Sequence, residues 1–185
     1  MRIISGKYKG HHLVSFQADH IRPTTDRVKE SLFNKIQGLV EDARVLDLFS
    51  GTGSLGLEAL SRGAREVLFV EKSRKSLQIL ERNLAKLKVT EPYQVMQKDV
   101  LGFLRGYEGE PFDLIFVDPP FTEKMAHDVL LTADFAAAKL FHPETLLMIE
   151  SGQGETVLES YSSLVRSDVR EFGDKSLSFY RLKTS

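Results

Sequence analysis

The sequence contains no cysteine, and this absence limits the chemistry that the chain can carry out. Disulfide bonds, thiolate nucleophiles and cysteine-ligated zinc are all excluded. The five histidines are scattered and show no spacing of the kind that metal-ligating pairs have. We therefore expect neither a disulfide framework nor a metal centre.

Long hydrophobic runs are also missing. No apolar stretch approaches the roughly 18 residues that a membrane helix needs. The first residues, "MRIISGKYKG", have a charged start but lack the apolar segment and the small-residue cleavage site of a signal peptide. We therefore expect a protein of the cytoplasm that does not contact a membrane.

The chain has almost no net charge, with a formal value of −1 over 185 residues. Composition as a whole therefore gives no hint of a nucleic-acid partner. The charge is unevenly placed, however, because residues 1–13 contain Arg2, Lys7 and Lys9 and no acid. This local excess indicates either a phosphate-binding surface or simply a solvated strand. With 42% hydrophobic residues, the length fits one main domain.

Strand and helix patterns alternate after residue 44. Strands are expected at 44–49, 66–71, 93–99, 112–118 and 145–150. Helices are expected at 53–63, 73–88 and 123–141. Such alternation predicts an α/β fold with a doubly wound, mostly parallel sheet of seven strands. The last two strands, 165–172 and 176–183, surround the turn "GDK" and predict an antiparallel hairpin at one edge of the sheet.

The residues before 44 have a different pattern. Apolar residues at helical spacing predict an amphipathic helix over 27–40, introduced by Pro23. The segments "RIISG" and "HHLVSF" predict a small β-hairpin. We therefore divide the chain into an N-terminal appendage, 1–22, and a main domain, 23–185.

A glycine-rich loop follows the first expected strand of the main domain. The stretch "DLFSGTGSLG" contains G-x-G-x-x-G at 51–56, where open parallel sheets bind their ligands. This motif alone also suits a dinucleotide. Asp47, four residues before Gly51, would repel a pyrophosphate but would attract an ammonium or a sulfonium, the charges of S-adenosylmethionine. The alternative is that Asp47 only ties down amides of the loop.

Two further acids end the next two expected strands. Glu71 is placed to accept both ribose hydroxyls of an adenosine, and Asp99 to accept from an adenine amine with Val100 beside the ring. The alternatives are that Glu71 pairs with Lys72 or Arg74, and that Asp99 caps the following helix. Three acids at successive strand ends favour a cofactor site. Its expected residues are Asp47, Ser50, Gly51, Thr52, Gly53, Glu71, Lys72, Asp99 and Val100.

The stretch "FDLIFVDPPF", 112–121, ends a buried strand on Asp118-Pro119-Pro120-Phe121. The amine of a nucleic-acid base is a poor nucleophile, because its lone pair is delocalised into the ring. The Asp118 carboxylate and the Pro119 carbonyl can accept its N–H bonds and direct the lone pair at a methyl group, and the prolines fix that geometry. Phe121 offers a face for stacking. The alternative is a strand end closed by a rigid turn.

The stretches "VLDLFSGTGSLGLEALSRGA", "FVEK", "KDV" and "DLIFVDPPF" resemble the ordered motifs of class I S-adenosylmethionine-dependent methyltransferases. With "MRIISGKYKG" and "RPTTDRVKESLFN" in front, residues 1–150 closely resemble the RsmD family. The resemblance implies methylation of the exocyclic N2 of a guanine in 16S rRNA, of the guanine-966 type, in the small ribosomal subunit. It also implies a monomer, and RNA contacts by the appendage and by Arg2, Lys7, Lys9, Arg22, Thr24 and Arg27.

Two features of the resemblance leave choices open. Related amine methyltransferases often have tyrosine where Phe121 stands, and phenylalanine retains the stacking surface without the hydroxyl. Glu150, at the end of the next strand, either lines the base pocket or caps a turn.

Three other functions are alternatives to this one. An adenine-N6 DNA methyltransferase uses a similar tetrapeptide, but such enzymes usually carry a recognition domain for which the chain has no room. A nicotinamide-dependent oxidoreductase built on the glycine loop would bind NAD and would not bind S-adenosylmethionine. The third is an RNA-binding assembly module that has lost catalysis, and the intact set of motifs argues against it.

Overall fold

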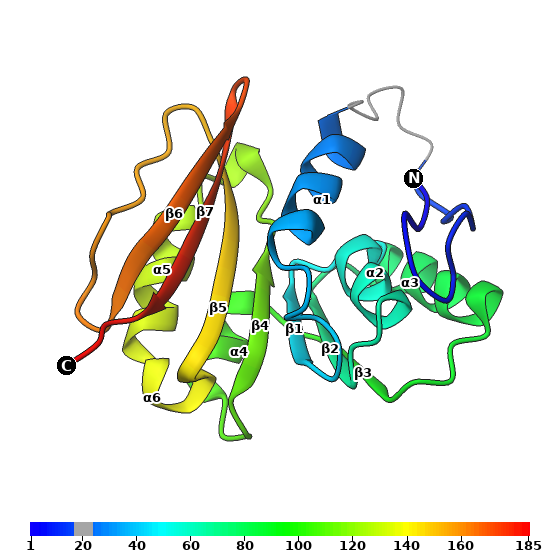
Figure 1. Cartoon of the computed structure of the whole chain (residues 1–185), viewed down its shortest axis with the longest axis horizontal. Helices are drawn as coiled ribbons and strands as arrows, with labels where there is room; N and C mark the ends of the chain where they lie inside the picture. Colours follow the sequence, from blue (N-terminus) through cyan, green and yellow to red (C-terminus); the bar gives the residue numbers. More distant parts are fainter. Residues whose placement is uncertain (17–23) are drawn as a thin grey trace.

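One mixed sheet of seven strands organises the molecule, in the order β3-β2-β1-β4-β5-β7-β6 (Figure 1). The computed structural model describes residues 1–16 and 24–185. Strands β1 to β5 are parallel, and β7 is antiparallel to both of its neighbours, β5 and β6. The predicted α/β class, the doubly wound sheet and the antiparallel edge are confirmed. The strands are β1 (Arg44–Leu48), β2 (Glu66–Glu71), β3 (Tyr93–Gln97), β4 (Phe112–Val117), β5 (Phe141–Gly152), β6 (Leu164–Phe172) and β7 (Lys175–Leu182).

The helices connect these strands and cover both faces of the sheet. They are α1 (Thr24–Lys35), α2 (Ser54–Ser61), α3 (Arg74–Leu87), α4 (Val100–Gly106), α5 (Ala126–Phe135) and α6 (Ala137–Leu140), with a short 3₁₀ helix, η1 (Phe121–Glu123). The single helix expected over 123–141 is wrong. It breaks at Ala136, and the chain turns so that Phe141 can enter β5 opposite Phe112 of β4.

The sheet is buried on both faces because its central strands are continuously apolar. In β4, Leu114 and Phe116 face the layer of α1, α2 and α3, whereas Ile115 and Val117 face the layer of α4, α5 and α6. Phe33 of α1 packs on Phe116 with ring centroids 5.6 Å apart. Helix α1 therefore lies over β4 next to the end of that strand where the Asp-Pro-Pro-Phe segment begins.

The N-terminal segment folds back on itself and packs on the main domain. A single antiparallel bridge joins Arg2 to His12, so the expected hairpin is reduced to one pair. Ile3, Tyr8 and Leu13 are buried in the core layer that contains α2 and α3. The Glu58 carboxylate of α2 accepts from the Ile4 amide at 3.1 and 3.0 Å. The segment is thus attached to the helix that follows the glycine loop.

The strand order reverses between β1 and β4, which places a crevice beyond their carboxyl ends. Asp47, Glu71, Asp99 and Asp118 lie at or next to the carboxyl ends of β1, β2, β3 and β4, and Glu150 lies near that of β5. Within the described parts of the chain, no helix is long and apolar enough to cross a membrane.

Candidate functional site

The glycine loop brings the start of α2 close to the sheet. Gly53 adopts φ 92°, a left-handed conformation that favours glycine, immediately before the helix. A Cβ on Gly56 would lie 2.3 Å from the Phe69 ring and 2.9 Å from Asp47 Oδ2, so only glycine fits there. The Gly56 amide donates to Asp47 Oδ2 at 2.9 Å. The helix therefore packs directly on the buried carboxyl at the end of β1.

Asp47 is 1% exposed, and burial raises the pKa of its carboxyl to about 7. The hydrogen bond from Gly56 opposes this rise, and the nearby Glu71 charge adds to it. The alternative in which Asp47 ties down loop amides is thus correct in part, since Gly56 lies within the motif. A cationic neighbour nevertheless strongly stabilises the ionised form of a buried acid whose pKa is raised.

The alternative for Glu71 was an ion pair with Lys72 or Arg74. The structure shows neither pair among the described residues. Glu71 Oε2 accepts from the Gly51 amide at 2.9 Å and its Oε1 from the Ser73 amide at 2.8 Å. Lys72 instead lies 3.5 Å from Glu123 on the surface. The carboxylate of β2 is therefore held between the glycine loop and the start of α3.

Asn83 of α3 is fully buried and contacts the glycine loop from the other side. Its amide nitrogen donates to the Thr52 carbonyl and to the Val14 carbonyl, both at 3.0 Å. Its side-chain oxygen accepts from the Val14 amide at 2.7 Å. One side chain thus connects the glycine loop to the N-terminal segment.

Asp99, the third acid, has the helix-capping role that was its alternative interpretation. Asp99 caps α4, because its Oδ2 accepts from the Gly102 amide at 3.0 Å. Val100, the first residue of that helix, is buried. Neither residue lines the hollow that contains Glu71, so a contact of theirs with adenine stays a prediction.

The fit of S-adenosylmethionine to this site can be tested on the groups that line it. Asp47 and Glu71 bring carboxylates to the loop, as a ligand with an ammonium and a sulfonium requires. Ser50 Oγ is buried and has no hydrogen-bond partner among the described residues, so it offers a donor and an acceptor to a ligand. These residues fit the cofactor better than they fit a pyrophosphate.

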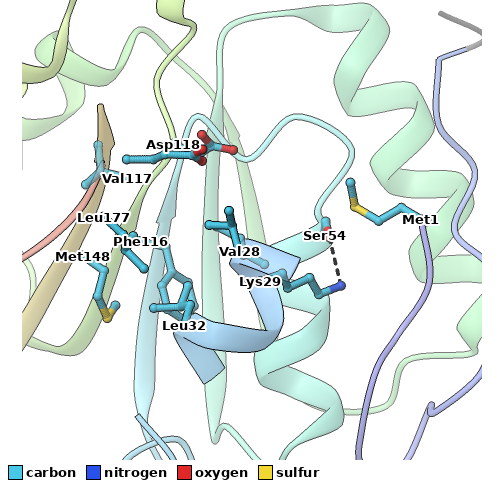
Figure 2. A pocket seen from close by; sticks show the side chains of 12 residues that line it. Met1, Val28, Lys29, Leu32, Ser54, Phe116, Val117, Asp118, Met148 and Leu177 are labelled. Carbon is cyan, nitrogen blue, oxygen red and sulfur yellow. Dashed lines mark hydrogen bonds between the residues drawn. The ribbon is translucent and has the colours of Figure 1, made fainter. Parts of the chain in front are cut away.

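The Asp-Pro-Pro-Phe segment separates two hollows. One is lined by Phe49, Glu71, Lys72 and the segment itself, Asp118 to Phe121. The other, of about 70 Å³, lies between α1 and the sheet, and Asp118 lines it too (Figure 2). Figure 2 shows Val28, Leu32 and Phe116 below Asp118 in this second hollow. Asp118 is therefore the residue that both hollows share.

Asp118 is exposed to these hollows and lies beside another acid. Loss of hydration and the neighbouring Glu150 carboxyl raise the pKa of Asp118 well above its ordinary range, while Lys175 lowers it. Water that reaches the exposed side chain weakens the first cause, so the effect of Glu150 matters more. Lys175 Nζ lies 2.8 Å from Glu150 Oε1.

Phe121 begins η1 and packs over the ends of β5 and β7. Lys175 Nζ lies 4.4 Å from the centroid of its ring. A Cβ on Gly152 would come within 3.2 Å of the same ring. One side of the ring therefore faces protein.

The basic residues predicted to contact RNA are placed unequally. Lys7 donates to Glu91 at 2.9 Å and to Thr90 at 3.0 Å, so its charge is compensated. The predicted residues Arg2, Lys9 and Arg27 are exposed and form no ion pair with any described residue. Arg22 lies outside the described residues, and Thr24 is the first residue of α1.

Sequence reasoning missed three polar residues of this region. Asn83 interrupts the leucine stripe of α3, and that position is a signal that could have identified it. Lys29 of α1 is 2% exposed and donates to Ser54 Oγ at 3.0 Å, as Figure 2 shows. Lys175 has no sequence signal at all, because only the pairing of β7 with β5 brings it to Glu150.

A family model described as "Conserved hypothetical protein 95" matches residues 1–181. The chain is 40% identical to ribosomal RNA small subunit methyltransferase D of Haemophilus influenzae over 132 residues, which cover 70% of this chain and 68% of the relative. The chain belongs to the RsmD family.

Two further similarities extend over the whole RsmD-type chain. A Bacillus subtilis protein, YlbH, provisionally named as an rRNA methyltransferase, is 34% identical over 188 residues and 98% of each chain. A solved Escherichia coli structure, provisionally named as the methyltransferase yhhF, has a TM-score of 0.86 at 32% identity and covers 100% of this chain and 99% of that one. The RsmD family model includes the N-terminal segment, the glycine loop, Asp118 and Lys175.

Proposed function

We propose that this protein is an S-adenosylmethionine-dependent methyltransferase that methylates the exocyclic N2 of a guanine, of the guanine-966 type, in 16S rRNA of the small ribosomal subunit. Membership of the RsmD family supports the proposal, since relatives carry the name of ribosomal RNA small subunit methyltransferase D. The observation that carries it is the position of Asp118, which lines both the hollow next to the cofactor loop and the hollow under α1.

The proposed cofactor residues would hold S-adenosylmethionine across the carboxyl ends of β1 and β2. Asp47 and Ser50 lie next to the glycine loop, and Glu71 already accepts the Gly51 amide. Bound there, S-adenosylmethionine supplies an electrophilic methyl group on a sulfonium. The protein's part is positioning, because an in-line displacement needs no covalent intermediate with the enzyme.

Asp118 and Pro119 would orient the amine that receives the methyl group. The Pro120 carbonyl accepts from the Glu123 amide at 3.2 Å, whereas the Pro119 carbonyl accepts no backbone hydrogen bond from the described residues. The Pro119 carbonyl thus remains available to an N–H of the base. Proline at 120 restricts Pro119 to extended conformations, so this carbonyl is fixed before the substrate arrives.

The base must leave its stack to reach this segment, so the target should be a loop or a flipped nucleotide. The appendage and the predicted basic residues would bind the surrounding phosphates. Arg2, Lys9 and Arg27 are the described candidates whose charges are not compensated by an ion pair with a described residue. Phe121 would stack on the base.

The deciding experiment is transfer of labelled methyl groups to small ribosomal subunits from cells that lack this protein, followed by mapping of the modified nucleotide. We expect label on guanine N2 with the wild type. Asp118→Ala should lower the rate by roughly 10²- to 10³-fold, as loss of one positioned hydrogen-bonding group does elsewhere, with little change in cofactor affinity.

Asp128→Ala, on the exposed surface of α5, serves as the matched control and should leave the rate unchanged. Transfer that survives in Asp118→Ala would contradict the assigned role of the tetrapeptide. Cofactor binding without transfer to the subunits would contradict the proposed substrate.

A further inference from the structure

Two carboxyl groups lie side by side at the carboxyl ends of β4 and β5. Val117 pairs in register with Ile149, so the next residues, Asp118 and Glu150, are neighbours on the same face of the sheet. Both line the hollow under α1. Their carboxyl groups are close enough that Glu150 contributes to the raised pKa of Asp118.

Lys175 compensates one member of this pair. It belongs to β7, where it is in register with Gly152 of β5, and its Nζ lies 2.8 Å from Glu150 Oε1. The side chains of Lys175 and Glu150 are only 8% and 12% exposed. The ammonium at this distance holds the Glu150 side chain in place, and a carboxylate acts only as a hydrogen-bond acceptor.

The face of the hollow next to Asp118 therefore presents two adjacent acceptors to a base. Guanine has two adjacent donors on one edge, the exocyclic N2 amine and the ring N1–H. Adenine has an amine beside a ring nitrogen that carries a lone pair instead. A carboxylate opposite that lone pair would be repelled, and its own hydrogen-bonding capacity would stay unfilled.

We propose that Glu150 reads the N1–H of the target guanine while Asp118 receives an N–H of the N2 amine, and that Lys175 is the positioning residue that holds Glu150 in place. This inference rests on the proposed function and adds the residue that selects guanine over other amine-bearing bases. When guanine binds, its two N–H groups face the two carboxyl groups, and a proton held on Asp118 by its raised pKa passes to water.

The test compares two bases at the target position of an otherwise identical small-subunit RNA substrate, guanine and 2-aminopurine. Both carry the N2 amine, but 2-aminopurine has a lone pair at N1 and no oxygen at position 6. For the wild type we expect kcat/KM to be at least roughly tenfold higher for guanine, in keeping with the discrimination that paired hydrogen bonds give.

Glu150→Gln should change this preference, because the glutamine amide can donate to the lone pair at N1. Its guanine-to-2-aminopurine ratio should fall by roughly tenfold or more relative to the wild type. If the wild type preferred guanine only because 2-aminopurine lacks the oxygen at position 6, Glu150→Gln would leave that preference unchanged. Lys175→Met should lower the ratio less, and neither variant should change cofactor affinity, which also verifies that they fold.

Glu144→Gln is the matched control, since Glu144 is an exposed acid at the opposite end of β5. It should leave the ratio unchanged. Equal transfer to both bases by the wild type, or an unchanged ratio in Glu150→Gln, would overturn the role of Glu150 and leave the methyltransferase proposal intact. Failure of the wild type to modify guanine would overturn both.

Discussion

The acids on the two sides of the strand-order reversal are held in different ways. At the ends of β1 and β2, Asp47 and Glu71 accept hydrogen bonds from backbone amides of Gly56, Gly51 and Ser73. At the ends of β4 and β5, the Asp118 and Glu150 side chains accept from no backbone amide of any described residue. They lie beside each other, and the charge that compensates them comes from Lys175.

This difference teaches what each side can offer to a ligand. Backbone amides hold the carboxylates of β1 and β2 in fixed positions, which suits a cofactor site that must be formed before the substrate arrives. The carboxyls of β4 and β5 keep acceptor capacity that only an incoming donor can fill. The carboxylates of β1 and β2 are thus preorganised to bind a positively charged ligand. The carboxyls of β4 and β5 are preorganised to accept hydrogen bonds from a ligand.

The largest expected effect concerns stability on the β1 side. Asp47 has a folded-state pKa of about 7, raised by burial, so the folded protein binds more protons than the unfolded chain from about pH 4 to 7. Stability is therefore lost as the pH rises through this window. Asp47→Asn keeps an acceptor for Gly56 and removes the loss, which gives a gain of at most about 4 kcal/mol at pH 8 and about 1.5 kcal/mol at pH 5.

Urea unfolding of both proteins at the two pH values measures this gain. Asp128→Asn, an exposed acid, should show no pH-dependent difference from the wild type. If the gain in the free energy of unfolding did not grow with pH, burial would not be raising the pKa of Asp47. The same variant should bind S-adenosylmethionine more weakly, because the buried charge is gone.

The second effect concerns cofactor affinity. Glu71→Ala removes the acceptor of both the Gly51 and Ser73 amides. It should weaken S-adenosylmethionine binding by roughly 10- to 100-fold, since a partly buried donor that loses its partner costs up to about 1–3 kcal/mol. Glu71→Gln retains one acceptor oxygen and should lose less. Calorimetric titration gives both constants. Equal losses in the two variants would argue against a structural contribution from the loop amides.

The third effect tests the link between the glycine loop and the N-terminal segment. Asn83→Ala removes two hydrogen bonds to Val14 and one to Thr52. We expect faster hydrogen exchange of the Val14 amide together with a several-fold loss of cofactor affinity. Asn34→Ala, an exposed asparagine of α1, is the control. Faster exchange with unchanged affinity would show that the loop does not depend on this side chain.

The smallest effect separates two lysines of the N-terminal segment. Lys9 forms no ion pair with a described residue, whereas Lys7 is paired with Glu91. Lys9→Ala should reduce the slope of log affinity for RNA against log salt by about 0.7–0.9, and Lys7→Ala by less. Cofactor affinity should stay constant in both. Equal slopes for the two variants would mean that the ion pair with Glu91 opens when RNA binds.

Much of the fold could be predicted from periodicity. The strand over 66–71 has the predicted bounds, and the helix over 73–88 differs by one residue at each end, because Ser73 is a capping residue and the leucine stripe is regular. The helix expected over 123–141 was wrong because its alanines favour a helix locally, while the register of β5 with β4 requires the chain to turn at Ala136.

The candidate site was predicted unevenly for a similar reason. Asp47, Glu71 and Asp118 each follow an apolar strand, and the carboxyl ends of parallel strands meet at one edge, so their proximity follows from sequence order. Asn83 and Lys29 contribute through contacts across long sequence separations. Lys175 belongs to an antiparallel hairpin, and its neighbour depends on a register that sequence spacing does not give.

The sequence by itself determined the alternation of strands and helices, the glycine loop and the rigid tetrapeptide, because each depends on local periodicity and backbone restriction. Only the tertiary structure decided which acids are held by backbone amides and which lie beside another acid, and it alone brought Lys175 to Glu150. These outcomes depend on strand order, register and burial, which are long-range properties that no local pattern encodes.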